Sequence, residues 1–219
     1  MSKKAILIGA TGLIGANLLE KLLASSNYRE ILVIARKKID SNNPKLKQLT
    51  INLDELHLHS DEIIGDDVFC CLGTTVKQTP NLELYKKIDY QYPLDLAHIA
   101  FKNGAKTYHL VSSVGADAKS KIFYTRTKGE VERDLQAIPF QSMNIYRPSL
   151  LDGNRKENRL GEKLMTITMR LINPILVGGL RKYRSIRIEK VAAAMLNQAG
   201  KEPKGIHIYA SDEIEQLSH

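Results

Sequence analysis

The sequence has few cysteines and no long apolar run, and both shortages limit the classes of protein it can belong to. Only two of its 219 residues are cysteines, the neighbours Cys70 and Cys71. Adjacent strand residues point to opposite faces, so a disulfide between them would be strained. No stretch reaches the roughly 18 apolar residues of a membrane-spanning helix, and the first apolar run is too short for a signal peptide. We therefore expect a soluble protein of the reducing cytoplasm with no membrane partner.

The charge pattern lacks the features of a nucleic-acid-binding protein. The formal net charge is +8, but the 32 lysines and arginines are interleaved with 24 acidic residues along the chain. The densest basic run, "RKYRSIR" at Arg181–Arg187, carries one aromatic residue, whereas single-strand readers interleave several. The six histidines show no metal-ligand spacing beyond His57 and His59. We expect neither nucleic acid nor metal, and favour an enzyme with a phosphorylated ligand.

The sequence does contain a regular alternation of apolar strands and amphipathic helices. Strands are predicted at Ala5–Ala10, Glu30–Arg36, Leu49–Leu53, Asp66–Gly73, Lys106–Ser113 and Phe140–Ser149. Helices are predicted at Gly15–Ser25, at Thr79–Gly104 with a kink or break near Pro93, and at Phe123–Gln136. Repeated strand–helix–strand units predict an α/β fold with a doubly wound parallel sheet, the Rossmann fold.

After Ser149 the alternation fades. Helices are predicted at Leu164–Ile172, Arg187–Ala199 and Ser211–Leu217, with a short strand at Gly205–Ala210. This last third is too small for an independent domain. We therefore expect a single domain over residues 1–219, with a cofactor-binding core at 1–150. Residues 151–219 would form a small cap region at the sheet edge where ligands bind.

Three glycines, Gly9, Gly12 and Gly15, stand where the first strand passes into the first helix, in "GATGLIG". A pyrophosphate needs free backbone N–H groups at a helix N-terminus and no side chain in the way. The first glycine permits the sharp turn, the second lets the backbone approach the ligand, and the third allows close helix–strand packing. The strand before the motif and the helix after it favour a dinucleotide site over a turn without ligand.

The second strand ends without an acid. A carboxylate there usually holds the ribose 2′-hydroxyl of NAD, but this chain has Arg36, Lys37 and Lys38, and no acid before Asp40. A guanidinium binds a 2′-phosphate well. The pattern favours NADP(H) over NAD(H), although such cations can also be solvated loop residues.

Tyr124 and Lys128, in "YTRTK", lie four residues apart and share one face of a predicted helix. Tyrosine loses its proton near pH 10, and a nearby ammonium is expected to lower that pKa enough for acid–base catalysis. The preceding strand ends in "VSSVG", so that Ser112 or Ser113 could present a hydroxyl to the substrate.

These motifs together resemble known families. "GATGLIG", "VSSVG", "YTRTK" and "YRPSLLDG" are similar to the short-chain dehydrogenase/reductase superfamily in its extended or atypical branch. "FCCLGTT", "LVSSVGAD" and "YTRTKGEVE" resemble more narrowly the Tat-interacting-protein family of small atypical reductases. The likeness runs from Lys4 to about Ala199 and implies an NADP-binding fold with a Ser–Tyr–Lys active site.

The resemblance also implies a role for individual residues. Ser113 would orient the substrate oxygen, Tyr124 would be the acid–base, and Lys128 would bind the nicotinamide ribose and tune Tyr124. Further cofactor contacts are implied for Gly9, Thr11, Gly12, Leu13 and Ile14 at the pyrophosphate, Arg36 and Lys37 at the 2′-phosphate, Asn52 and Leu53 beside adenine, Leu72, Gly73, Thr74 and Ser112 along the groove, and Pro148 and Ser149 at the nicotinamide.

Two departures from the family pattern stand out. "CLGTT" replaces the usual Asn-Ala-Gly, so the fourth catalytic residue of that class, an asparagine, has no motif match. The larger C-terminal lobe of sugar-nucleotide epimerases is missing, which argues against a nucleotide-sugar substrate.

The sequence thus predicts an NADP(H)-dependent oxidoreductase that moves hydride to or from a small carbonyl or alcohol substrate. The alternative is an NADP(H)-binding regulatory or redox-sensor protein that acts through protein partners. An intact Ser–Tyr–Lys set favours the enzyme. A homodimer or a protein partner is possible, and the substrate's identity stays open.

Overall fold

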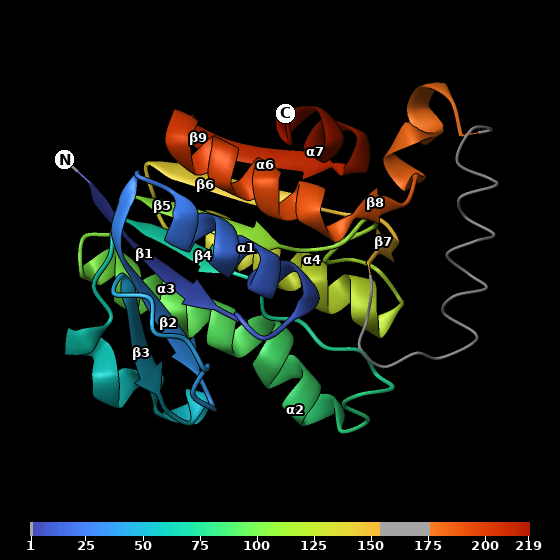
Figure 1. The fold of residues 1–219 in the computed structure, drawn as a ribbon. Coiled ribbons are helices and arrows are strands. Elements are labelled where there is room, and N and C mark those ends of the chain that lie inside the picture. The colour runs from blue at the N-terminus through green and yellow to red at the C-terminus, as the bar shows by residue number, and fades with distance from the viewer. Residues whose placement is uncertain (1, 154–175) are drawn as a thin grey trace.

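The computed structural model describes residues 2–153 and 176–219. Seven strands form one sheet: β1 (Lys3–Ile8), β2 (Tyr28–Ala35), β3 (Leu46–Thr50), β4 (Asp67–Cys70), β5 (Thr107–Val111), β6 (Ser142–Arg147) and β9 (Gly205–Ala210). Their order across the sheet is β3-β2-β1-β4-β5-β6-β9, and every neighbouring pair is parallel (Figure 1). The doubly wound Rossmann fold is confirmed. The winding reverses direction between β1 and β4, and ligands bind beside the carboxyl ends of strands at such a point.

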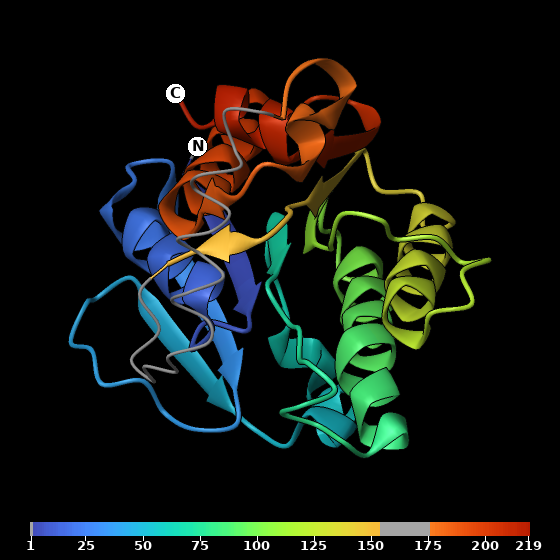
Figure 2. The same cartoon turned by 90° about the vertical axis from the view of Figure 1, so that its right-hand side faces the viewer.

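Helices cover both faces of the sheet. α1 (Leu13–Ala24) and α6 (Ile188–Lys201) lie on one side, and α3 (Tyr92–Lys102) and α4 (Phe123–Gln136) lie on the other (Figure 2). The apolar β1 serves both layers, because Ala5 and Leu7 belong to the core under α1 and α6, whereas Ile6 and Ile8 face α3. This alternation has the two-residue period of a strand, so an unbroken apolar run is what a sheet buried on both faces requires.

Shorter elements complete the described fold. They are a 3₁₀ helix (Leu53–Glu62), α2 (Leu82–Lys86), a π-helical turn (Lys87–Gln91), a second 3₁₀ helix (Gly178–Tyr183), α7 (Ser211–Leu217), and the two-stranded sheet of β7 (Leu151–Asp152) and β8 (Ile186–Arg187).

The structure revises the predicted helix at Thr79–Gly104. It consists of α2, the π-helical turn and α3 in direct succession, with helical backbone angles at the junctions, and Pro93, the second residue of α3, follows just after the π-helical turn. The irregular hydrogen-bond pattern therefore lies beside the residue that has no N–H to donate. β3 begins at Leu46, three residues before the predicted Leu49, and it ends at Thr50. The bounds of α4 are as predicted.

The C-terminal third builds more of the core than the sequence suggested. α6 packs beside α1, and β9 pairs with β6 as the last strand of the large sheet. The helix predicted at Leu164–Ile172 lies outside the described residues. The segment at 151–219 therefore supplies a strand and a covering helix, rather than only a cap over the ligand edge.

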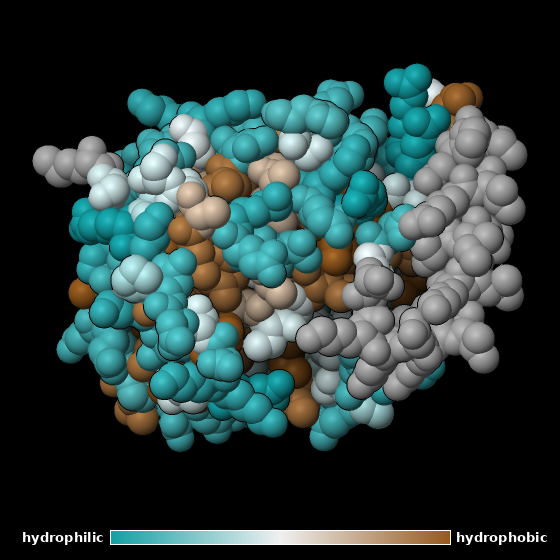
Figure 3. Space-filling view, in the orientation of Figure 1, coloured by the Kyte–Doolittle hydropathy of each residue, from teal (hydrophilic) through white to brown (hydrophobic). Residues whose placement is uncertain are grey.

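The face of the molecule that carries α1 and α6 is mainly hydrophilic (Figure 3). Among residues 2–153 and 176–219, no helix combines the length and apolarity that crossing a lipid bilayer demands.

Candidate active site

The glycine turn lies at the point where β1, β4 and α1 meet. Gly9 has φ +84°, and a Cβ on it would come within 2.5 Å of the Cys71 carbonyl oxygen after β4. A Cβ on Gly15 would be 2.1 Å from the carbonyl oxygen of Gly9. Neither position admits a side chain, so the two glycines let the start of α1 lie directly against the strand ends.

The N-terminus of α1 is built to receive an anion. Gly12 caps the helix without any side-chain hydrogen bond, and the first turn contains no acidic residue. The first N–H groups of a helix have no partner within it, and the helix dipole favours a negative charge there. The predicted pyrophosphate contacts at Thr11, Gly12, Leu13 and Ile14 all lie at this helix start, where the Gly12 N–H already donates to the Gly9 carbonyl at 3.0 Å.

Arg36 and Lys37 follow directly after β2 and are exposed to solvent. β2 neighbours β1 in the sheet, so these cations stand at the same carboxyl edge as the glycine turn. Their position suits a 2′-phosphate.

Several residues assigned to the cofactor have other contacts in the structure. Asn52 caps the first 3₁₀ helix by accepting the N–H of Asp54, and Leu53 is buried in the core under α3. Ser149 donates its hydroxyl to the Arg184 carbonyl and its N–H to Ser211 Oγ at 2.7 Å. Ser149 thus ties the end of β6 to the C-terminal segment, and its hydroxyl is already engaged.

The two adjacent serines after β5 differ sharply in their surroundings. The Ser112 hydroxyl donates to Glu132 Oε1, and its N–H donates to the Tyr146 carbonyl at 2.7 Å. The Ser113 hydroxyl is buried and has no hydrogen-bond partner among the described residues. A buried hydroxyl without a partner is costly in a folded protein, so Ser113 is the serine available to a ligand.

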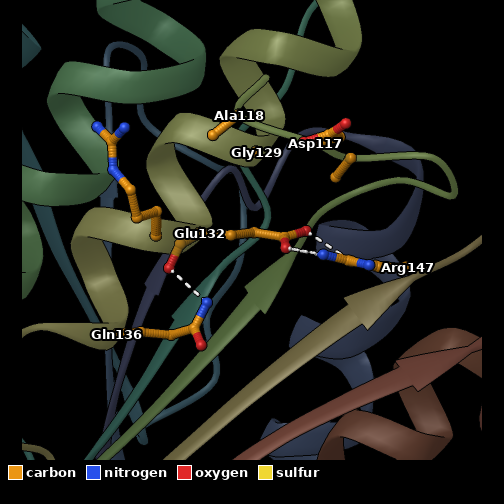
Figure 4. A pocket seen from close by; sticks show the side chains of 8 residues that line it. Asp117, Ala118, Gly129, Glu132, Gln136 and Arg147 are labelled. Carbon is orange, nitrogen blue, oxygen red and sulfur yellow. Dashed lines mark hydrogen bonds and ion pairs between the residues drawn. The ribbon is translucent and has the colours of Figure 1, made fainter. Parts of the chain in front are cut away.

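Glu132, on α4, holds in place the loop that carries Ser112 and Ser113 (the serine loop). Its side chain is 2% exposed and accepts from Arg147 Nε at 3.0 and 3.1 Å (Figure 4). It also accepts the Ser112 hydroxyl. Glu132 and Arg147 border a cavity of about 260 Å³ beside α4, whose other lining residues include Ala118, Gly129 and Gln136. Neither Ser113, Tyr124 nor Lys128 lines it, so this cavity is separate from the predicted catalytic residues.

α4 is held close to the serine loop. A Cβ on Gly129 would lie 2.1 Å from the backbone nitrogen of Ala118, and the Asp117 N–H donates to the Thr125 carbonyl at 3.0 Å. The loop after Ser113 therefore packs against the first turns of α4, where Tyr124 lies half-buried. The motifs "SSVGAD" and "YTRTKGE" form one packed unit.

Lys128 is buried on α4 and forms an ion pair with Asp89, with 2.8 Å between Nζ and Oδ1. Asp89 Oδ2 also accepts the N–H of Thr74 at 2.9 Å. Burial lowers the pKa of Lys128, but the charge of Asp89 and the nearby Tyr124 outweigh it, and the pKa is raised overall. Gly73 borders the pair, since a Cβ there would be 3.6 Å from Nζ.

Sequence reasoning missed Asp89. One feature of the sequence could have indicated it: Asp89 lies four residues after Tyr85 and so shares the buried face of the predicted helix. A carboxylate buried there needs a positively charged or hydrogen-bonding partner.

Comparison with known proteins places the chain in a family. The model of the NAD dependent epimerase/dehydratase family matches residues 5–211. The chain belongs to this family. It is an NAD(P)-dependent enzyme, and the resemblance to short-chain dehydrogenases/reductases is confirmed.

Members of the family with similar sequences include rat Protein HTATIP2, which is 32% identical over 74% of this chain and 69% of its own length. Protein fmp52, mitochondrial, of Emericella nidulans is 36% identical over 71% of this chain and 70% of its own length. Protein FMP52, mitochondrial, of Coccidioides immitis is 29% identical over 96% and 94%. The expected likeness to Tat-interacting-protein-type reductases is thereby confirmed.

Solved structures show the same fold at low identity. MoeE5 in complex with UDP-glucose and NAD has a TM-score of 0.71 and 15% identity, covering 98% of this chain and 80% of that protein. The UDP-N-acetylglucosamine 4-epimerase of Methanobrevibacter ruminantium has a TM-score of 0.70 and 17% identity, covering 95% and 76%.

The family comparison corrects the expected location. The sequence predicted a cytoplasmic protein from its free cysteines, but several relatives are named mitochondrial. The cytoplasmic prediction was wrong because free thiols report a reducing compartment and do not say which one.

The two cysteines lie at the end of β4, Cys70 buried and Cys71 partly exposed. Cys70 and Cys71 are free, and burial raises the pKa of both thiols. Within the described residues no three His, Cys, Asp or Glu side chains cluster as metal ligands would.

Proposed function

We propose that the protein is an NADP(H)-dependent oxidoreductase that moves hydride to or from a small carbonyl or alcohol substrate, with Tyr124 as acid–base. The observation that carries the proposal is the buried, unpartnered hydroxyl of Ser113 next to Ser112, whose hydroxyl is already engaged. A protein that only bound a dinucleotide would have no use for such a group. A substrate oxygen would supply the missing partner.

The cofactor fits the residues at the carboxyl edge of the sheet. The glycine turn and the N-terminus of α1 would hold the pyrophosphate, because Gly9 and Gly15 admit no side chain and the first N–H groups of a helix lack partners within it. Arg36 and Lys37 would hold a 2′-phosphate. Leu72, Gly73 and Thr74 follow β4 and would line the groove between these sites. The nicotinamide supplies or accepts hydride when it is bound.

The chain's own groups would handle the proton and the polarity of the substrate. Ser113 would donate a hydrogen bond to the substrate oxygen and orient it. Tyr124 would give its phenolic proton to that oxygen in reduction and take it back in oxidation. The Lys128 ammonium would bind the cofactor ribose and stabilise the phenolate by its charge.

The proposed homodimer or protein partner stays a prediction.

The test is the variant Tyr124→Phe. It removes the proton donor and keeps the ring, so NADPH oxidation across a panel of aldehydes, ketones and quinones should fall about a hundredfold or more. NADPH affinity should stay within about threefold, because the phenol contributes little to cofactor binding. Tyr90→Phe is the matched control, since it also removes only a tyrosine hydroxyl, one bonded to Asp134 near the C-terminal end of α4.

Equal turnover in Tyr124→Phe and the wild-type protein would reject Tyr124 as the acid–base. Tight NADPH binding with no oxidation of any substrate in the wild-type protein would instead support the regulatory alternative.

A further inference from the structure

Asp89 is the most deeply buried carboxylate near the cofactor groove. Its side chain is fully shielded from solvent, and that of its partner Lys128 is 6% exposed. A buried ion pair seldom adds stability over a well-packed apolar pair, because both charges lose their hydration. The buried Asp89–Lys128 ion pair is thus an energetically unfavourable feature located among the residues proposed for catalysis.

The backbone around Asp89 is shaped to present its carboxylate to the groove. The residue lies in the π-helical turn Lys87–Gln91 between α2 and α3, and such turns are frequent at functional sites. Oδ2 accepts the Thr74 N–H at 2.9 Å, which ties the carboxylate to the groove segment after β4. The Tyr85 hydroxyl donates to the Thr74 carbonyl at 3.4 Å and supports the same segment.

The ion pair also lies next to Gly73, in the segment proposed to line the cofactor groove. A Cβ on Gly73 would lie 3.6 Å from Lys128 Nζ and 3.8 Å from Asp89 Oδ1. Gly73 itself is exposed, so the pair lies directly behind the surface that a cofactor would cover.

We infer that Asp89 is a positioning residue of this site: its carboxylate fixes the Lys128 ammonium toward the groove at Gly73 and serves as its permanent counter-charge. The inference deepens the proposed function and rests on it only for the identity of the ligand. Asp89 acts through Lys128 and takes no part in proton transfer.

The inference has a consequence for the charge of Lys128. Besides its own two members, three titratable groups act on or border the ion pair: Tyr124 on the helix of Lys128, Cys70 at the end of β4, and Tyr85 on α2. Burial disfavours the ammonium, and Asp89 is the largest influence that opposes it. Without Asp89 the lysine should lose its proton at a lower pH.

The first test follows this proton directly by NMR of protein labelled with ¹³C at lysine Cε. Lys128→Met identifies the Lys128 resonance by its disappearance. In the wild-type protein this resonance should keep its charged position up to about pH 10. In Asp89→Asn its midpoint should fall by about one pH unit or more. An unchanged midpoint in folded Asp89→Asn would overturn the inference.

Asp67→Asn is the matched control. Asp67 is equally buried on β4 and pairs with Lys3 at 3.1 Å, but at the opposite edge of the sheet. It should leave the Lys128 resonance unmoved. A purely structural effect of removing a buried aspartate would move it in both variants.

The second test measures NADPH affinity by the fluorescence of the reduced cofactor at pH 6.5 and pH 9.0. The wild-type Kd should change less than about threefold, whereas Asp89→Asn should bind about tenfold more weakly at pH 9.0 than at pH 6.5. Equal pH profiles would contradict the inference. Failure of the wild-type protein to bind NADPH would count against the proposed function alone, because the NMR result needs no cofactor.

Should Asp89→Asn fail to fold, the apolar exchange Asp89→Leu with Lys128→Met replaces it. Since Asp89 acts only through Lys128, this double variant should bind NADPH as Lys128→Met does. A further loss of more than about threefold would show that Asp89 acts on its own and would overturn the inference.

Discussion

At the scale of single residues, burial sets the pKa of His109. It lies fully buried in the middle of β5, stacked on Phe69 with ring centres 4.8 Å apart, and its Nδ1 is 3.1 Å from the Tyr146 hydroxyl. Burial, with the charge of Lys3 as a smaller influence, lowers the pKa of His109 to about 3. The imidazole is therefore neutral in the folded protein at physiological pH.

This histidine predicts a loss of stability in mild acid. The unfolded imidazole binds a proton below about pH 6.5 and the folded one does not, so stability falls as pH drops through that range. Between pH 6.5 and pH 5 the contribution is about 2 kcal/mol.

Urea unfolding at both pH values checks this prediction. His109→Phe keeps a ring in the stack and should lose that part of the pH dependence, while His57→Gln, at an exposed position, should keep it. The same slope in His109→Phe as in the wild-type protein would exclude His109 as its source.

At the residue scale the sequence named candidate site residues but not the partners that surround them in the fold. Tyr124 and Lys128 could be found because their spacing defines a helix face. The choice between Ser112 and Ser113 could not be made, since it depends on Glu132, which is 20 residues away in sequence. Asp89 was missed for the same reason, because its partner Lys128 becomes its neighbour only when the π-helical turn packs against α4.

At the scale of single elements, the packing of α4 decides where Tyr124 and Lys128 lie. Gly129 allows the helix to touch the loop after Ser113, and any side chain there would strike the backbone of Ala118 at 2.1 Å. Backbone atoms cannot rotate aside as a side chain can. A side chain at position 129 would therefore force α4 or the loop after Ser113 to shift.

Gly129→Ala should therefore lower the free energy of unfolding by about 2 kcal/mol, even though alanine is the better helix former. Gly200→Ala in α6 is the control, since its Cβ meets nothing nearer than 3.7 Å, and it should be neutral or raise stability by up to about 1 kcal/mol. The comparison is made by urea unfolding. Equal stabilities of the two variants would mean that α4 does not need this close contact.

The elements themselves were predicted well where the signal was local. α4, β9 and α7 have the predicted bounds, because apolar periodicity and breaking residues mark both ends. β3 was displaced by three residues, since its register depends on pairing with β2 rather than on its own pattern. The π-helical turn was not predicted, because apolar periodicity does not distinguish a single π turn from α-helix.

At the scale of the whole molecule, the parallel sheet gathers distant segments at one edge. The glycine turn after β1, the cations after β2, the groove after β4 and the serines after β5 all follow strand ends that point the same way (Figure 2). The fold could be predicted because this alternation repeats along the chain. The role of residues 151–219 could not, since nothing local shows that β9 closes the sheet beside β6.

The central claim is that this edge binds NADP(H), and calorimetric titration with NADPH and NADH tests it most directly. The account predicts that NADPH binds about tenfold more tightly than NADH, a preference worth one charge-assisted hydrogen bond. Arg36→Glu should abolish the preference by weakening NADPH binding alone, and Lys102→Glu, an equal charge change at the end of α3, should leave it intact. Absence of binding by either dinucleotide to the folded wild-type protein would contradict the account.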